Sequence, residues 1–227
     1  MNRFLCRLGV IAVLWGGAHH ALAYDNELWM SFTKKLWDNA SDKQPATTKI
    51  SWYTELRQRD DGRDNYGAFN GLILRHDINP YLQVGAGVKH IALRNRDRSY
   101  DPRFRTELEI TPTLPFGENN QFNISLRNRW EMFKDEGKKD LNRMRHRLQI
   151  NGKIQGQGWL KGWYISHELI YNLRAGHYDL RQYRMIPIGL KFNINNTPVS
   201  AFYMLARGPG NPHGDNYDHV LGFSFAL

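Results

Sequence analysis

Arginine and glutamate recur at every second position along several stretches of this sequence. The segment Arg103–Thr113 is the clearest, because its odd-numbered positions are charged or polar and its even-numbered positions are mostly apolar. Guanidinium groups keep their charge and bind carboxylates through two parallel hydrogen bonds. Rings of arginine or lysine also make pores select anions and phosphates. These rows therefore predict an anion-favouring pore with small anionic solutes, such as acidic sugars, as its permeants.

The same rows support a second interpretation, in which the charges pair with one another and fill the interior as a salt-bridge lattice. Small barrels fill their interiors with side chains, and buried charges must be paired. The sequence leaves both interpretations open, and the two can hold together. The positions predicted to carry the rows are Arg57, Arg59, Arg103, Arg105, Glu107, Glu109, Arg127, Arg129, Glu131, Arg143, Arg145, Arg147, Glu168 and Arg174.

Alternation with a period of two places successive side chains on opposite faces of a β-strand. Segments of roughly ten alternating residues, separated by turn-rich stretches, are typical of a membrane β-barrel. The mean hydropathy of −0.62 agrees with this, because such a barrel alternates lipid-facing and lumen-facing residues. The fold class predicted is therefore all-β, a single antiparallel transmembrane β-barrel in the outer membrane of a Gram-negative cell.

The number of strands is not fixed by the pattern. Counting alternating segments gives an odd total, whereas bacterial barrels of this kind have an even number of strands. Either the first segment, near Glu27–Trp37, is a tail or plug and the barrel has 10 strands, or one segment is missed and it has 12. Residues 24–227 are expected to form this one domain. Pro187 lacks the N–H that a central strand needs, so a bulge is expected there.

Residues 1–23 are predicted to be a cleaved signal peptide. Arg3 and Arg7 precede the short apolar run Leu8–Trp15, and Ala21-Leu22-Ala23 fits a small-x-small cleavage pattern. Cys6 is the only cysteine of the chain, which leaves no thiol after cleavage. The formal net charge of +9 suits an anionic solute or the anionic lipid of the outer membrane, while export argues against a nucleic-acid partner.

The last strand, expected over 217–227, alternates to the final residue. Its outward set begins at His219 and ends at Leu227, with Gly222, Ser224 and Ala226 opposite. A final strand of this kind resembles the recognition signal by which outer-membrane barrels engage the barrel assembly machinery. Those signals usually end in Phe, and this chain ends in Leu227.

The order of these segments resembles one family. It runs from Leu28-Trp29 and Glu55-Leu56-Arg57 through the Gly-rich Val84–Val88 to Leu126–Glu131, Arg143–Arg147 and His167-Glu168. The series is similar to the Gram-negative outer-membrane barrels catalogued as domain of unknown function 2490. Membership would imply an outer-membrane barrel and transfers no activity or catalytic residue. A vaguer likeness to small acidic-sugar porins rests on size and on the inward arginines.

Two other classes of function remain open. A lipid or lipopolysaccharide hydrolase would need a Ser–His pair on the outer wall. His146 and His167 are predicted to face lipid, but Ser125 and Ser166 fall on the opposite faces. A soluble periplasmic carrier would invert every face, with apolar side chains inside and arginines in water. No catalytic residue, metal site or cofactor is expected.

Overall fold

The computed structural model describes residues 26–41, 44–60, 63–95, 99–135, 141–156, 158–174, 177–207 and 217–227, without the side chains of residues 135, 174 and 177–179. The predicted signal peptide, residues 1–23, lies outside the described residues. No helix in the described ranges is long and apolar enough to cross a membrane.

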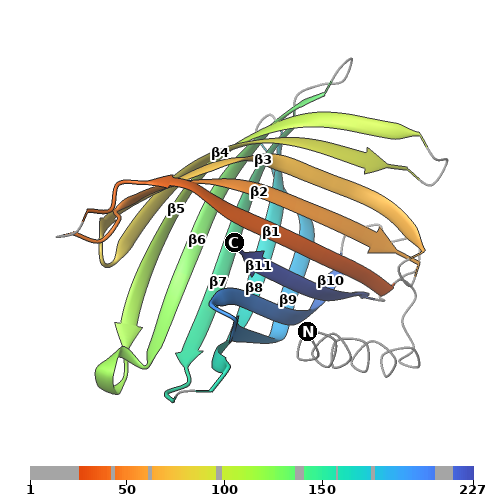
Figure 1. Ribbon diagram of the computed structural model, residues 1–227. Helices are drawn as coiled ribbons and strands as arrows, with labels where there is room; N and C mark the ends of the chain where they lie inside the picture. The colour runs from red at the N-terminus through yellow and green to blue at the C-terminus, as the bar shows by residue number, and fades with distance from the viewer. Residues whose placement is uncertain are drawn as a thin grey trace.

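Eleven strands form one closed barrel, which confirms the predicted all-β class and the single barrel (Figure 1). A 3-10 turn, η2 (Glu118–Asn120), lies between the fifth and sixth strands. The strands are β1 (Asn26–Asp38), β2 (Thr48–Arg59), β3 (Asp64–Asn79), β4 (Leu82–Arg94), β5 (Tyr100–Phe116), β6 (Phe122–Asp135), β7 (Leu141–Lys153), β8 (Leu160–Arg174), β9 (His177–Ile194), β10 (Thr197–Arg207) and β11 (Asp218–Ala226).

The barrel closes through a parallel pair, β1 with β11, while every other neighbouring pair is antiparallel. Figure 1 shows β1 lying beside β11. The parallel register runs from Asn26 opposite His219 to Thr33 opposite Ala226. The expectation of 10 or 12 strands assumed antiparallel closure, which requires an even number. The first segment is a barrel strand and not a plug, and parallel pairing lets an odd number close.

Local chemistry explains several features of the strands. Around Pro187 the register of β9 shifts against both neighbours, so the predicted bulge is confirmed. The ring of Pro187 leaves no N–H for a ladder there. Between β9 and β10, Asn195 and Asn196 both have positive φ, of 50° and 63°. Two such residues make the tight hairpin turn that fits the twist of neighbouring strands.

The two faces of the wall differ in chemistry. Along β5 the burial alternates without a break, with Arg105 and Glu107 buried and Phe104 and Leu108 exposed on the outside. Large apolar side chains cover the outer face of most strands, including Leu72, Val88, Ile110, Leu126, Leu148, Ile165 and Ile188. The inverted arrangement of a soluble carrier, with the arginine rows outside, is not found in the described strands.

The barrel has two distinct ends. At the C-terminal end β11 finishes, and β1 joins β2, β3 joins β4, β5 joins β6, β7 joins β8 and β9 joins β10. At the opposite end, called the far end here, β1 and β11 both begin and β2, β4, β6, β8 and β10 end. The arginine rows lie nearer the far end, so the candidate site is in that half of the lumen.

Candidate functional site in the barrel lumen

Strands β5 to β8 bring the predicted charge rows together inside the barrel. The register places like charges directly opposite each other, with Glu107 opposite Glu131 and Arg129 opposite Arg145. Like charges in directly opposed positions destabilise a sheet. Ion pairs offset this repulsion. Some are diagonal, such as Arg129 with Glu107, and others join directly opposed residues, such as Arg129 with Glu109 and Arg147 with Glu168.

The resulting charge lattice consists of four glutamates and seven cations. Arg129 lies 2.7 Å from Glu109 and 3.3 Å from Glu107, while Lys89 lies 2.8 Å from Glu107. On the next strands, Arg145 bridges Glu131 and Glu168 at 2.8 Å each. The members are Lys89, Arg105, Glu107, Glu109, Arg127, Arg129, Glu131, Arg145, Arg147, Glu168 and Arg184.

Glu168 is the centre of the lattice. Its carboxylate lies 2.8 Å from Arg127 and from Arg145, 3.2 Å from Arg147 and 3.9 Å from Arg184. The side chain of Glu168 is only 2% exposed. A buried carboxylate is stable only when its charge is matched by close partners, and here four arginines from the three strands β6, β7 and β9 supply them.

Cation–π contacts continue around the rest of the wall, where Arg57 also pairs with Glu55 at 2.5 Å. The Arg184 guanidinium lies 5.0 Å from the centre of the Trp29 ring in β1. The Arg57 guanidinium in β2 lies 3.7 Å from the centre of the same ring. Arg57 also lies 4.3 Å from the Phe69 ring, and Arg105 lies 6.0 Å from it. Cation–π contacts at such distances are attractive.

Together these contacts form a ring around the inside of the barrel. It runs from Glu168 through Arg184, Trp29, Arg57, Phe69, Arg105, Glu131 and Arg145 back to Glu168. Glu131 is 1% exposed and Arg145 is 8% exposed, so the layer holds little water around these groups. We call this closed ring the constriction layer.

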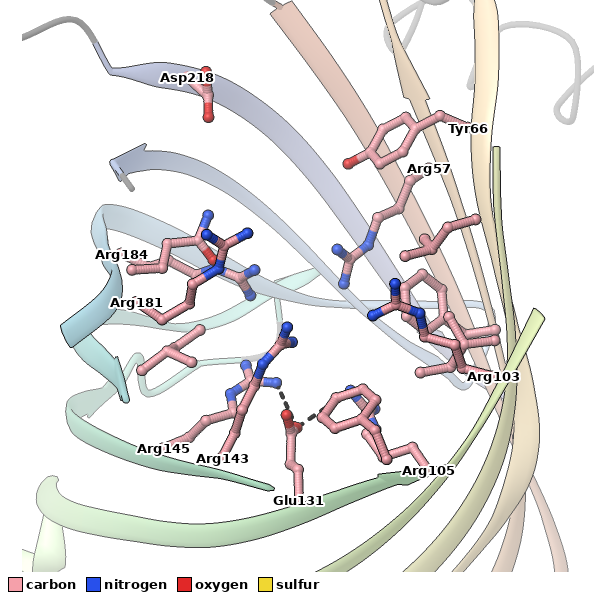
Figure 2. Close-up of a pocket in the computed structure, with 16 residues that line it drawn as sticks. Arg57, Tyr66, Arg103, Arg105, Glu131, Arg143, Arg145, Arg181, Arg184 and Asp218 are labelled. Carbon is pink, nitrogen blue, oxygen red and sulfur yellow. Dashed lines mark hydrogen bonds and ion pairs between the residues drawn. The ribbon is translucent and has the colours of Figure 1, made fainter. Parts of the chain in front are cut away.

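A cavity of about 480 Å³ lies between the constriction layer and the far end. Figure 2 shows its labelled arginines converging from several walls, with Asp218 above them and Glu131 at its base between Arg105 and Arg145. Seven arginines and two acidic residues line this chamber. The arginines are Arg57, Arg103, Arg105, Arg143, Arg145, Arg181 and Arg184.

The predicted lumen residues divide between these two regions. Arg105, Glu107, Glu109, Arg127, Arg129, Glu131, Arg145, Arg147 and Glu168 belong to the charge lattice, and Arg57, Arg103 and Arg143 line the chamber. Arg59 lies near the far end, 2.7 Å from Asp64. The side chain of Arg174 lies outside the described part of the chain.

Sequence reasoning missed four contributors: Trp29, Lys89, Arg181 and Arg184. Arg181 and Arg184 are three residues apart, so strict alternation cannot place both inside. A shift in register between β8 and β9 pairs Tyr171 with Leu180 but Ile170 with Gln182, which leaves Arg181 as the extra residue. Bulges of this kind re-aim side chains. For Lys89, a signal existed in the alternation of Val88, Lys89 and His90.

The outer-wall histidines contact aromatic rings. The His146 Nδ1 atom lies 2.7 Å from the Asn128 side-chain oxygen, and its ring lies edge-on to Tyr171 at 6.0 Å. His167 meets Tyr183 at 4.6 Å in the same edge-on manner. Ser166 is buried on the opposite face from His167, as the alternation predicts.

Comparison with protein families gives a match over most of the chain. A family model described as "Protein of unknown function (DUF2490)" matches residues 34–217. This confirms the family resemblance predicted from the order of the segments. The comparisons with curated proteins and with solved structures find no match.

Proposed function

Because the chain belongs to the DUF2490 family, whose description assigns no activity, we propose its function from the lumen itself. We propose an outer-membrane β-barrel that passes small anionic solutes passively through an arginine-rich lumen. The observation that carries the proposal is the excess of cations along the lumen axis. Chamber and charge lattice together contain eleven cations and five acidic residues, and even with Glu55 and Asp101, which pair with Arg57 and Arg103, the cations remain in excess.

The outer surface supports the membrane part of this proposal. Phe104 is 60% exposed and Leu114 is 62% exposed, although both are large and apolar. Soluble monomers rarely expose contiguous apolar surface on this scale. Near the C-terminal end, aromatic rings contact one another around the wall, with Phe116 5.5 Å from Phe122 and Phe122 6.3 Å from Trp163. Aromatic belts of this kind lie at membrane–water interfaces.

The constriction layer limits how solutes would pass. Its side chains are held by ion pairs of 2.8 to 3.9 Å, and we propose that these contacts separate when a solute crosses. We therefore expect brief or small conductance steps, unlike the steady current of a wide porin. The layer also favours a second candidate, a structural barrel whose lumen stays plugged by the charge lattice.

A planar-bilayer experiment separates the two candidates. The refolded protein is inserted into a bilayer under a salt gradient, and single-channel steps and the reversal potential are recorded. The channel proposal expects discrete anion-selective steps. A silent bilayer with protein that circular dichroism shows to be folded would leave the plugged structural barrel.

Charge-reversed variants test whether the lattice cations set the selectivity. Arg127→Glu with Arg145→Glu is expected to move the reversal potential toward cation selectivity, because it inverts one charge of the constriction layer and one of the adjoining charge lattice. The matched control is Lys134→Glu with Lys161→Glu, which makes the same change in net charge at exposed positions. If the glutamate pair fails to refold, the Gln pair is used. Unchanged selectivity in a conducting double variant would end the anion-filter idea.

A further inference from the structure

One wall of the chamber carries guanidinium groups with little carboxylate charge beside them in the described part of the chain. We propose that Arg143, Arg181 and Arg184 form a binding site for a small organic acid with an apolar body, such as an aromatic carboxylate or an aryl phosphate ester. The proposal rests on the anionic-solute function proposed above and names the class of solute.

The contacts of these arginines with described residues leave most of their charge unmatched. Arg143 donates from Nε to the Asn172 side-chain oxygen at 3.3 Å and lies 4.6 Å from the Phe133 ring. Arg184 donates from Nε to Gln182 at 2.9 Å, and its nearest carboxylate, that of Glu168, is 3.9 Å away and shared with three closer arginines. Within the described residues, neither Arg143 nor Arg181 has an ion pair with a carboxylate.

The bulge in β9 completes the wall. Arg181 is the extra residue between the pairs Tyr171–Leu180 and Ile170–Gln182, and it lines the chamber together with Gln182. Figure 2 shows Arg181 beside Arg184, with Arg143 and Arg145 below them. Strands β7 and β9 thus present several guanidinium groups to one side of the cavity.

An anion is the simplest partner for this wall. Guanidinium groups do not lose their proton in proteins, so the charge cannot be removed by titration. Three such groups near one another repel, and a bound anion offsets that repulsion. The planar fork of arginine matches the oxygens of a carboxylate or phosphate and holds them through two hydrogen bonds.

The rest of the chamber favours an organic anion over an inorganic one. Phe69, Ile91 and Phe133 form a buried apolar cluster with Leu93 packed against it. These four side chains and Ile170 line the same cavity as the arginines. The volume of about 480 Å³ lies within the usual range of ligand pockets, ~300–1,000 Å³. An acid group on the β7–β9 wall would leave the apolar body of the ligand against this cluster.

The test measures binding to the refolded full chain in detergent by isothermal titration calorimetry. The probes are benzoate and phenyl phosphate, with acetate and inorganic phosphate as their counterparts without an aromatic body. We expect the aromatic probes to bind about tenfold or more tightly than their counterparts, because burying the ring adds transfer free energy. Which aromatic probe binds better identifies the carboxylate or the phosphate as the preferred head group.

Variants locate the site. Arg143→Gln with Arg181→Gln is expected to weaken the aromatic probes about tenfold or more, since each loses charge-assisted hydrogen bonds. The control, Arg75→Gln, changes another arginine of the wall that does not line the chamber and should leave binding unchanged. Equal affinity for benzoate and acetate, or binding unaffected by the double variant, would overturn the proposal.

A conductance measurement on the same preparation distinguishes failure of the binding site from failure of the proposed channel function. Specific binding in a barrel that stays silent in bilayers would retain the site and end the channel function. Anion-selective conductance without any binding of the aromatic probes would retain the channel and overturn the site.

Discussion

At the scale of single residues, the lumen depends on carboxylates that serve several arginines at once. Glu168 contacts four guanidinium groups and Glu131 contacts three, and both are almost fully buried. Alternation in the sequence predicted which side these residues face. It could not predict their partners, because those follow from the register between strands, which pairs some of these charges directly and others diagonally.

Glu168→Gln is expected to destabilise the barrel. It removes the charge that compensates four buried or half-buried arginines, and breaking a buried ion pair in this way costs about 3–5 kcal/mol. The measurement is the urea midpoint of unfolding in detergent, followed by heat-modifiable migration in gels. Glu118→Gln, at an exposed carboxylate in η2, should leave the midpoint in place. Equal midpoints for both variants would show that the lattice contributes little stability.

At the scale of elements, most strands were predictable and the closure was not. The periodic segments matched strands because each has one apolar and one polar face, and the bulge at Pro187 followed from its missing N–H. The closure depends on pairing between β1 and β11, which are farthest apart in sequence. No local pattern distinguishes a parallel partner from a plug, so the assumption of an even number excluded the observed barrel.

A crosslink tests the parallel closure. Ser31 of β1 is opposite Ser224 of β11, and Ser224 is opposite Ser200 of β10. In a background with Cys6→Ala, Ser31→Cys with Ser224→Cys is expected to form a disulfide under mild oxidation, because neighbouring strands lie about 4.8 Å apart. The gel mobility of the oxidised form is measured.

The control for this crosslink is Ser31→Cys with Ser200→Cys. These positions are two strands apart, roughly 9.6 Å, which exceeds the reach of a disulfide. Crosslinking of the control pair and not of the first pair would mean that β1 does not close the barrel beside β11.

At the scale of the whole molecule, the barrel is asymmetric along its axis. The chamber lies toward the far end, and the aromatic contacts of Phe116, Phe122 and Trp163 lie toward the C-terminal end. With the end of the last strand on the periplasmic side, as the proposed outer-membrane function expects, the chamber opens to the exterior. The sequence alone could not locate the chamber, because its walls come from strands spread from β2 to β11.

Surface labelling of cells tests this orientation. Asp60 lies after β2 at the far end, and Asn196 lies in the turn between β9 and β10 at the C-terminal end; both are exposed. In the Cys6→Ala background, Asp60→Cys is expected to react with a membrane-impermeant maleimide on intact cells. Asn196→Cys should react only after the outer membrane is permeabilised. The reverse result would place the chamber on the periplasmic side.

The constriction layer has an electrical consequence. A voltage across a membrane falls mainly where mobile ions are absent, and in this barrel that region contains the buried side chains of the constriction layer and the adjoining charge lattice. An ion in the chamber would then sit at nearly the external potential, so its binding should not respond to voltage. An ion crossing the layer would experience almost the whole drop, about 2.3 kcal/mol per elementary charge per 100 mV. Occupancy and permeation would therefore be controlled separately, the first by concentration and the second by the field.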